Sequence, residues 1–600
     1  MKLFPFTLIA LFIGTIVHSQ SSVPTKELDK KLNELLKASN TPGFSIAIVR
    51  GDQVIYSKGF GYSDLETQQK VDNNTLFAIG STSKAFTTAL LGIMEEEHDL
   101  SFDDSPRKYL PELEFFNDLL NTELTIKDLV CHRSGMPRHD YSWYLFPTES
   151  KDSLLARVKY QEPFADLRTQ WYYNNFGYLI QGMITAKITG KSWEDNIRER
   201  YFIPLDMKRS NLTIAELQQQ SNIAKGYEWA NLETTKPLDY FNIAAISPAG
   251  SINSSAAEMS NWLKVWLNNG KYNGKQVLPE SYIKKAINPL FLVGSGIADP
   301  AFPDQHLNSY GYAWFVSSYK GHYRLEHGGN IDGFTANVSL FPSDSLGIVI
   351  LCNQDGSLLP SLARNAVSDI LLNVKATDWV KYLNEKIGLA KIQLATAKSG
   401  SEESRVKGTT PTHSLEEFQG NYTHPAYGTV KLVVENDSLF AKFPVKKFYL
   451  EHWHYDVFNP LEVKNRAIDT STAQGLLFHF SMNDQGEIAS LKLKLEPTLD
   501  AMEFERTPFS AQVDVSKLND YVGEYELSGM KIKISLDGKS GLLMDVPGQP
   551  QYTLIPISDS EFTLKGIPGY KARFGINKDK VIELHMVQPN GTFTAKKVSK

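Results

Sequence analysis

A serine and a lysine three positions apart, Ser81 and Lys84, are the residues best placed to do chemistry in this sequence. Residues at this spacing share one side of a helix, so the hydroxyl and the amine can touch. Serine is a poor nucleophile until a base takes its proton, and a lysine amine can be that base when apolar surroundings lower its pKa. Phe77, Ile79 and Phe86 can supply those surroundings. The pair therefore predicts attack on a carbonyl, from a helix start where N–H groups favour an oxyanion.

The spacing alone is weak evidence, because Ser-x-x-Lys occurs several times in the chain and a serine before a helix is often only its N-cap. The other occurrences begin at Ser105, Ser281, Ser317, Ser404 and Ser528. Ser81 differs from them in its context. An apolar approach and Gly80 precede it, and a long apolar helix is predicted to follow over residues 81–97.

The elements that must hold this pair predict an α+β domain. Strands are expected at 43–49 and 53–61 and, as a hairpin, at 334–341 and 346–352. Helices are expected at 26–39, 178–189, 192–201, 256–267 and 358–373. Strands at both ends with helices between them indicate an antiparallel sheet assembled from the two ends of the domain.

Beyond this domain the pattern changes. Residues 395–412 are polar and are predicted to form a linker. The remaining chain repeats itself at an offset of 103 to 104 residues, so that Tyr422 matches Tyr525 and Phe458 matches Phe562. We expect two all-β modules, at 413–510 and 511–600, with one interlocked barrel as the alternative.

Composition and the chain start narrow the function classes. The chain has 600 residues, enough for several domains, and a net charge of −6 with scattered Lys and Arg, which does not suggest a nucleic-acid partner. Residues 1–19 have the charge, apolar run and small-residue end of a cleaved signal peptide, which predicts a secreted or periplasmic protein without a transmembrane anchor after cleavage. A retained membrane anchor is the alternative. Cys131 and Cys352 are expected to be buried thiols.

The segment from Phe77 to Lys84 resembles the first motif of the serine β-lactamase and penicillin-binding-protein superfamily, in its class C-like branch. Residues 124–130, 132–137 and 203–207 are similar to other segments common in these enzymes. The resemblance implies a transpeptidase-like α+β domain over residues 20–394. It also implies that the tail modules are small barrel or lipocalin-like domains of the kind often appended to such hydrolases.

The same resemblance assigns the remaining site residues. The second motif, Tyr-x-Asn, fits Tyr172 with Asn174 or Tyr173 with Asn175, and the Gly-Tyr that follows selects Tyr173 and Asn175. The tyrosine would help to move protons, with its phenolate favoured by the lysine ammonium, and the asparagine would orient substrate and lysine.

The third motif is expected in a variant form, as His327-Gly328-Gly329. A histidine in place of the usual lysine predicts a pH-dependent local charge, and the glycines would let substrate approach the strand. The backbone N–H groups of Ser81 and Asn330 would form the oxyanion hole. The alternative is a glycine-rich turn with a structural histidine.

The resemblance thus implies an exported serine hydrolase that forms an acyl-enzyme on amide, ester or β-lactam carbonyls, with D-alanyl peptides or β-lactams as the foremost substrates. It needs no metal or organic cofactor, and its partner is a small molecule or peptide. The alternative is a penicillin-binding or carbohydrate- or peptide-binding protein with little or no turnover. The sequence leaves the oligomeric state open.

Overall fold

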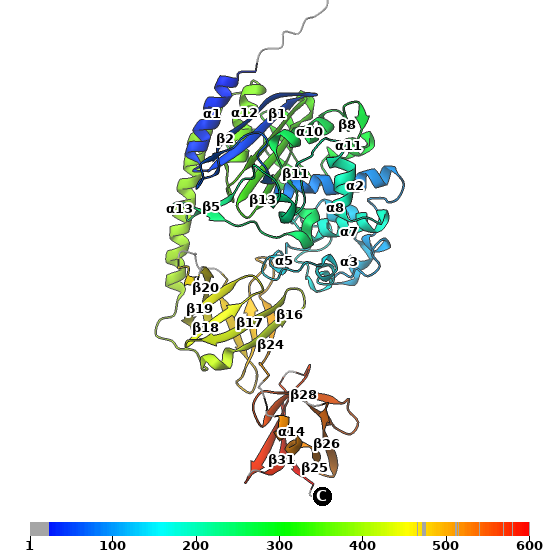
Figure 1. Cartoon of the computed structure of the whole chain (residues 1–600), viewed down its shortest axis with the longest axis vertical. Coiled ribbons are helices and arrows are strands. Elements are labelled where there is room, and N and C mark those ends of the chain that lie inside the picture. The colour runs from blue at the N-terminus through cyan, green and yellow to red at the C-terminus, as the bar shows by residue number, and fades with distance from the viewer. Residues whose placement is uncertain are drawn as a thin grey trace, which may run out of the picture.

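The computed structural model of the chain describes residues 23–464, 466–470, 476–510, 513, 515–538, 541–567, 569–578 and 580–598. It has an N-terminal domain, a first β-barrel (barrel 1, residues 413–510) and a second (barrel 2, residues 515–598), placed one after the other (Figure 1). The predicted signal peptide, residues 1–19, lies outside the described residues. No helix in the described ranges is both long and apolar enough to cross a bilayer.

A nine-stranded antiparallel sheet forms the centre of the N-terminal domain, in the order β10-β11-β12-β13-β14-β15-β1-β2-β3. Its strands are β1 (Gly43–Arg50), β2 (Gln53–Asp64), β3 (Gln69–Lys70), β10 (Phe291–Ser295), β11 (Leu307–Tyr310), β12 (Phe315–Tyr319), β13 (His322–Ile331), β14 (Phe334–Phe341) and β15 (Leu346–Cys352). The two ends of the domain meet where β1 pairs with β15, with Ile46 opposite Ile350. The predicted α+β fold, with its sheet assembled from both ends, is confirmed.

The two faces of the sheet bury different layers of helices. Side chains alternate along a strand, so Ile46 and Ile48 face α1 (Thr25–Ala38) and α12 (Leu359–Leu371), whereas Ala47 and Val49 face the larger helical layer with α10 (Ala256–Leu267). That layer also contains α2 (Lys84–Glu96), α3 (Asp118–Glu123), α4 (Ile126–Val130), α5 (Tyr141–Tyr144), α6 (Lys151–Leu155), α7 (Phe176–Thr189), α8 (Trp193–Ile197), α9 (Ile214–Gln218) and α11 (Glu280–Ala286). Cys131 and Cys352 are buried free thiols, as expected.

The tail forms two closed barrels, which confirms the predicted pair of β modules. Barrel 1 closes through the pairing of β19 with β20, and barrel 2 runs in order from β25 to β32. The strands of barrel 1 are β16 (Gly420–His424), β17 (Gly428–Glu435), β18 (Ser438–Lys442), β19 (Lys447–His454), β20 (Val457–Lys464), β21 (Ala467–Ile468), β22 (Phe478–Met482), β23 (Ile488–Leu493) and β24 (Met502–Thr507). Those of barrel 2 are β25 (Gly523–Leu527), β26 (Met530–Asp537), β27 (Gly541–Asp545), β28 (Tyr552–Pro556), β29 (Glu561–Leu564), β30 (Lys571–Asn577), β31 (Lys580–Gln588) and β32 (Gly591–Lys597), with α14 (Val515–Tyr521) before them.

The connection between the N-terminal domain and barrel 1 corrects the first part of the predicted linker, whereas residues 405–412 contain no helix or strand. Residues 395–404 continue α13 (Trp379–Ser404), which runs along one side of the molecule towards barrel 1 (Figure 1). Trp379 and Leu383 are buried at its start against α1 and α12. Once a helix is nucleated, each added residue costs little, so the polar residues that suggested a linker extend it.

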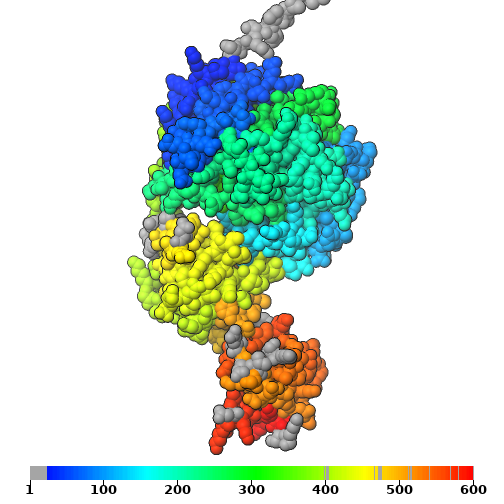
Figure 2. Space-filling model, viewed as in Figure 1, coloured from blue at the N-terminus to red at the C-terminus, as the bar shows by residue number. Residues whose placement is uncertain are grey.

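Barrel 1 is packed against the N-terminal domain (Figure 2). Leu145 and Phe146, which follow α5, are buried in the hydrophobic core of barrel 1, where the Phe146 ring lies 5.2 Å from that of Phe443 and 5.9 Å from that of Phe504. The Ser142 hydroxyl donates a hydrogen bond of 2.6 Å to the carbonyl of Ala426. The N-terminal domain thus completes the core of the first barrel.

Candidate active site

Ser81 lies in a short 3-10 turn, Gly80–Ser83, that leads directly into α2. Gly80 has φ of +51°, and a Cβ there would lie 2.8 Å from the backbone nitrogen of Asn330 on β13. Glycine is needed at position 80 both for the left-handed backbone and for the close approach of this strand. The turn therefore brings the Ser81 backbone against the strand that carries the third predicted motif.

Lys84 is fully buried, and its Nζ lies 3.0 Å from Ser81 Oγ. The same Nζ donates hydrogen bonds of 2.7 Å to Asn175 Oδ1 and 2.8 Å to the carbonyl oxygen of Ala249. Both of these oxygens are acceptors only. In a neutral amine they use the two N–H bonds, so that the lone pair is left for the Ser81 hydroxyl.

Burial lowers the pKa of Lys84 well below its ordinary value of 10.5. The charge of Arg138 lowers this pKa further, whereas the carboxylate of Asp140 raises it. The neutral amine is therefore favoured at lower pH than in an exposed lysine. Such a group is suited to accept a proton.

Asn175 is fixed by Asp140, a residue that no sequence pattern singled out. The Asn175 Nδ2 donates a hydrogen bond of 2.9 Å to Asp140 Oδ1, which leaves the amide oxygen directed at Lys84. Asn174 points elsewhere, donating to the Pro137 carbonyl at 2.6 Å and accepting from the Gly177 N–H. Of the two registers, only the one with Asn175 meets the lysine in these contacts.

Tyr173 belongs to the same cluster, with Lys84 Nζ 4.8 Å from the centre of its ring and the Arg138 guanidinium 5.1 Å from it. Its hydroxyl is buried and has no hydrogen-bond partner among the described residues. Burial raises the pKa of Tyr173, although the nearby Ser81 side chain and Arg138 oppose this effect. The expected phenolate is therefore wrong. Burial raises the pKa of Tyr173, and the Lys84 amine, whose own pKa is lowered by burial, is not a lasting positive charge that could stabilise a phenolate.

His327 is also buried beside this cluster, and its predicted pH-dependent charge is wrong. Burial, with the charge of Lys84, lowers the pKa of His327 to about 3. Its Nδ1 lies 2.6 Å from the Gly328 carbonyl, which can only accept, so the Nδ1 carries the hydrogen and Nε2 accepts from Tyr310 at 3.0 Å. The imidazole is thus a neutral structural link at physiological pH.

The strand after His327 has one open edge, which faces the Ser81 turn. Strand β12 pairs with β13 only as far as Glu326, whereas β14 pairs with it along Gly328, Gly329 and Asn330. A Cβ at Gly329 would lie 1.9 Å from the Ile79 carbonyl oxygen, so no side chain fits there. The backbones of Ser81 and Asn330 therefore lie together, as an oxyanion hole requires.

A cleft of about 220 Å³ opens above Ser81 and contains charged residues that sequence reasoning missed. Arg138, Trp143 and Tyr144 come from the segment around α5, and Asp332 and Asp355 come from the loops that follow β13 and β15. Burial raises the pKa of Asp355 to about 6 and, in the same direction, that of Asp332, to which the Tyr144 hydroxyl donates a hydrogen bond of 3.0 Å. No motif spacing connects these residues, because tertiary contacts alone bring them together.

Barrel 1 supports the segment that carries Arg138 and Asp140. His139 Nδ1 lies 2.8 Å from the Tyr427 hydroxyl of barrel 1 in a buried contact. Glu496 of barrel 1 is 3% exposed; burial raises its pKa to about 7, while the backbone amides of His139 and Arg138 act against that rise. The first barrel is thereby coupled to the wall of the cleft.

The described residues contain no cluster of three or more His, Cys, Asp or Glu side chains that could hold a metal ion. The cleft itself brings together a serine hydroxyl, a buried amine and a buried tyrosine hydroxyl.

The family model described as Beta-lactamase matches residues 28–370, more than half of the chain, and a domain of unknown function, DUF3471, matches residues 404–510. The chain belongs to the β-lactamase family. This family is part of the serine β-lactamase and penicillin-binding-protein superfamily, so the resemblance read from the sequence is confirmed. The family consists of serine hydrolases and their relatives.

Several known proteins of this family are similar to the chain. "Unguisins hydrolase ungD" of Aspergillus violaceofuscus is 25% identical over 70% of this chain and 79% of its own length. "Protein flp" of Staphylococcus aureus strain MW2 is 24% identical over 60% of this chain and 69% of its own. The structure of the octameric penicillin-binding protein homologue from Pyrococcus abyssi superimposes with a TM-score of 0.53 and 19% identity, covering 80% of this chain and all of that one, and supports the fold.

Proposed function

We propose that this protein is an exported serine hydrolase that forms an acyl-enzyme at Ser81 on amide, ester or β-lactam carbonyls. The observation that carries the proposal is the Lys84 amine, fully buried and 3.0 Å from the Ser81 hydroxyl. A serine becomes an effective nucleophile when a base within hydrogen-bond reach takes its proton. The same proposal includes Tyr173 as a neutral proton carrier and Asn175 as the group that orients Lys84. The strand from His327 through Gly328 and Gly329 to Asn330 is proposed as the substrate-binding edge, with the His327 imidazole neutral.

Acylation begins with the neutral Lys84 amine. As Ser81 Oγ attacks the carbonyl carbon, its proton moves to Lys84 Nζ, whose two other neighbours, Asn175 Oδ1 and the Ala249 carbonyl, then stabilise the ammonium. The backbone N–H groups of Ser81 and Asn330 receive the developing oxyanion. The buried Tyr173 hydroxyl, which keeps its proton at neutral pH, donates to the leaving group and regains a proton from Lys84.

Deacylation uses the same groups in reverse roles. Water takes the place of the leaving group, and Lys84 Nζ accepts one of its protons as the water oxygen attacks the acyl carbon. The same proton then passes from Lys84 to Ser81 Oγ as the Ser81–acyl bond breaks, which releases the acid and restores the serine hydroxyl. The rate of this second step distinguishes a hydrolase from a penicillin-binding protein, in which the acyl group persists.

The substrate class is proposed from the cleft and from the relatives. D-alanyl peptides and β-lactams are the foremost candidates, and the cleft of about 220 Å³ above Ser81 is lined by charged and aromatic side chains that can contact such a substrate. Arg138 offers a cation to a substrate carboxylate, and Asp332 with Asp355 offers anions to an amine. The "Unguisins hydrolase" relatives support a hydrolytic rather than a purely binding role.

The test is covalent labelling of the full chain by a fluorescent penicillin and by a fluorophosphonate, followed by intact-mass spectrometry. We expect one adduct per chain, either stable or turned over, that disappears in Ser81→Ala. Ser281→Ala is the matched control, because Ser281 and Lys284 have the same spacing at the start of a helix but are exposed. Labelling that persists in Ser81→Ala would contradict the assignment. Turnover of D-Ala-D-Ala peptides, L-Ala-L-Ala peptides, β-lactams and simple esters then decides among the proposed substrate classes.

A further inference from the structure

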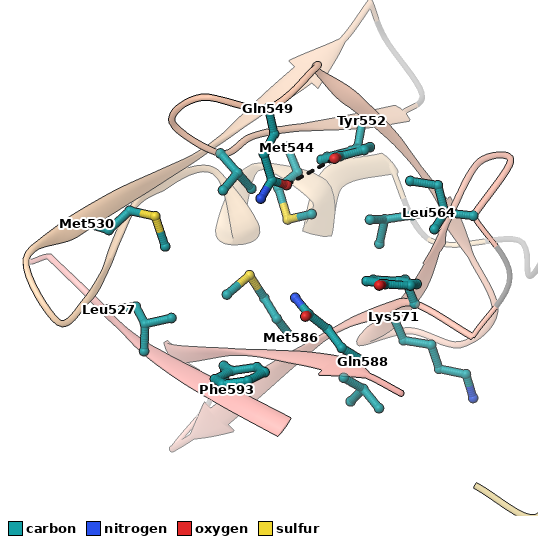
Figure 3. A pocket seen from close by; sticks show the side chains of 14 residues that line it. Leu527, Met530, Met544, Gln549, Tyr552, Leu564, Lys571, Met586, Gln588 and Phe593 are labelled. Carbon is teal, nitrogen blue, oxygen red and sulfur yellow. Dashed lines mark hydrogen bonds between the residues drawn. The ribbon is translucent and has the colours of Figure 1, made fainter. Parts of the chain in front are cut away.

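Barrel 2 contains a partly open cavity that the proposed hydrolase chemistry does not use. It has a volume of about 520 Å³, and methionines Met530, Met544 and Met586 direct their side chains into it from three strands (Figure 3). An eight-stranded barrel is just wide enough either to fill its interior with side chains or to hold one small ligand. In barrel 2, aromatic side chains around Tyr521 and Phe574 fill one part of the interior, and the cavity occupies another.

Comparison with barrel 1 shows which side chains are missing from the cavity of barrel 2. In barrel 1 the corresponding space is filled by Phe146 of the N-terminal domain, which packs on Phe443 and Phe504. Phe443 directly follows the third strand of barrel 1, and Val546 directly follows the third strand of barrel 2.

The strand pairing gives the second equivalence. Tyr422 lies opposite Arg506 in barrel 1, and its repeat partner Tyr525 lies opposite Lys597 in barrel 2. Two residues before these positions stand Phe504 and Ala595. Barrel 2 therefore has valine and alanine where barrel 1 has two phenylalanines, and within the described residues it has no inserted side chain equivalent to Phe146 in its core.

The cavity is uncharged. Among its lining residues, all of which lie in the described part of the chain, Lys571 is the single one with a charged side chain, and Figure 3 shows it directed away from the cavity. Its ammonium is paired with Glu487 of barrel 1. The amides of Gln549 and Gln588 point into the cavity from opposite sides (Figure 3), and Gln549 Oε1 is held by a 3.0 Å hydrogen bond from the Tyr552 hydroxyl.

We infer that barrel 2 binds an uncharged, largely apolar small molecule that carries one amide, carbonyl or hydroxyl group. The apolar walls provide burial, and the two glutamine amides meet the polar group. Small-molecule sites have this volume and this mixture of apolar walls with a few polar groups. Unbranched, polarisable methionines adapt to ligands of different shape, so the site accepts a class of molecules rather than one.

The test is titration of the full chain with N-phenyl-1-naphthylamine, an uncharged apolar dye whose fluorescence rises on burial. We expect saturable binding of one dye per chain, displaced by decanol more strongly than by decanoate. Val546→Phe gives barrel 2 the residue that barrel 1 has, fills the cavity and weakens binding by about tenfold or more. The matched control is Ile582→Phe on β31, where the side chain is 41% exposed, and it leaves the affinity unchanged.

Circular dichroism and thermal unfolding of both variants show whether they are folded. The inference is overturned if no saturable site is found, if Val546→Phe binds the dye as the unaltered chain does, or if decanoate competes better than decanol. It is also overturned if dye binding weakens as the chain self-associates, because a second copy then occupies the cavity. These outcomes are independent of the Ser81 assignment, since labelling of Ser81 is read separately.

Discussion

The cleft above Ser81 and the cavity of barrel 2 differ in the charge of the side chains that line them. The cleft gathers Arg138, Asp332 and Asp355 from segments far apart in the sequence, and burial moves the pKa of both carboxyl groups. The barrel cavity is lined mainly by methionine and aliphatic side chains, and its one cation turns outward. Groups with displaced pKa values are typical of sites that transfer protons, whereas an uncharged apolar cavity can bind but has no acid or base to offer. The chain thus separates chemistry from apolar binding.

The strongest test of this separation removes the amine. Lys84→Met takes away the base, and general-base catalysis contributes about 10²–10⁴-fold, so we expect acylation to slow by that amount. Dye binding in barrel 2 stays unchanged, and the fold is retained because methionine suits a buried site. Acylation is measured by mass spectrometry over time, with Lys284→Met, an exposed lysine at the same spacing, as the control. Equal acylation rates in Lys84→Met and in the control would contradict the role of Lys84 as the base and, with it, the assignment of proton-transfer chemistry to the cleft.

The second test concerns the side chain that fills barrel 1. Phe146 is 2% exposed, and truncation of a buried phenylalanine costs about 3–5 kcal/mol. We expect Phe146→Ala to weaken the docking of barrel 1 and to raise hydrogen exchange across residues 137–147, with slower acylation because Arg138 and Asp140 lie in this segment. Tyr141→Ala, at an exposed position in the same segment, is the control. Unaltered exchange would mean that barrel 1 does not hold the wall of the cleft.

Asp140 provides a third test, because it positions Asn175 and Arg138 without itself contacting the substrate. Asp140→Asn removes the carboxylate that accepts from Asn175 and pairs with Arg138. Misplacement of a catalytic group by about 1 Å can cost ~10²-fold, so we expect kcat to fall by about that factor with little change in KM. Because Asp140 raises the pKa of Lys84, the acidic limb of the pH profile also moves to lower pH. The exposed Asp166→Asn leaves both unchanged; a profile that does not move in Asp140→Asn points to a structural role alone.

The smallest expected effect is a pH dependence of the contact between barrel 1 and the cleft wall. Folding raises the pKa of Glu496 from 4.5 to about 7, so the folded state binds the extra proton between these values. Stability from this group is complete below pH 4.5 and is lost as the pH rises towards 7, by at most about tenfold per pH unit. The protection of residues 137–147 from hydrogen exchange, compared at pH 5.5 and pH 7.5, measures this loss of stability. Glu496→Gln flattens the difference, whereas Glu503→Gln, at an exposed position of barrel 1, retains it.

The sequence predicted the regular elements well where periodicity was strong. The helix over Ala256–Leu267 and the hairpin strands Phe334–Phe341 and Leu346–Cys352 have the expected bounds. Local patterns determine such elements, since apolar residues recur at the period of the helix or strand. The pairing of Ser81 with Lys84 was predictable for the same reason, because one helical turn fixes their distance.

The parts that could not be predicted depend on burial and on contacts between distant segments. The segment from Arg138 to Phe146 has no regular apolar period, and its place beside Asn175 comes from packing against barrel 1. The pKa values of His327 and Tyr173 were misjudged because a sequence shows neighbouring charges but not the loss of water around a group. The sequence alone was enough to detect the repeat. The difference between Phe504 in barrel 1 and Ala595 at the equivalent position of barrel 2 could be interpreted only once the structure placed Phe146 against Phe504.

The continuous helix α13 sets both the distance and the rotation about the helix axis between the N-terminal domain and barrel 1. Over its 26 residues it advances about 39 Å, and each residue turns the chain by about 100°. A single alanine inserted near residue 396 would rotate everything that follows away from Leu145 and Phe146, whereas an insertion of seven would nearly restore the angle but add about 10 Å. Homologous chains that keep this docking should therefore vary in the length of this helix far less than in its composition.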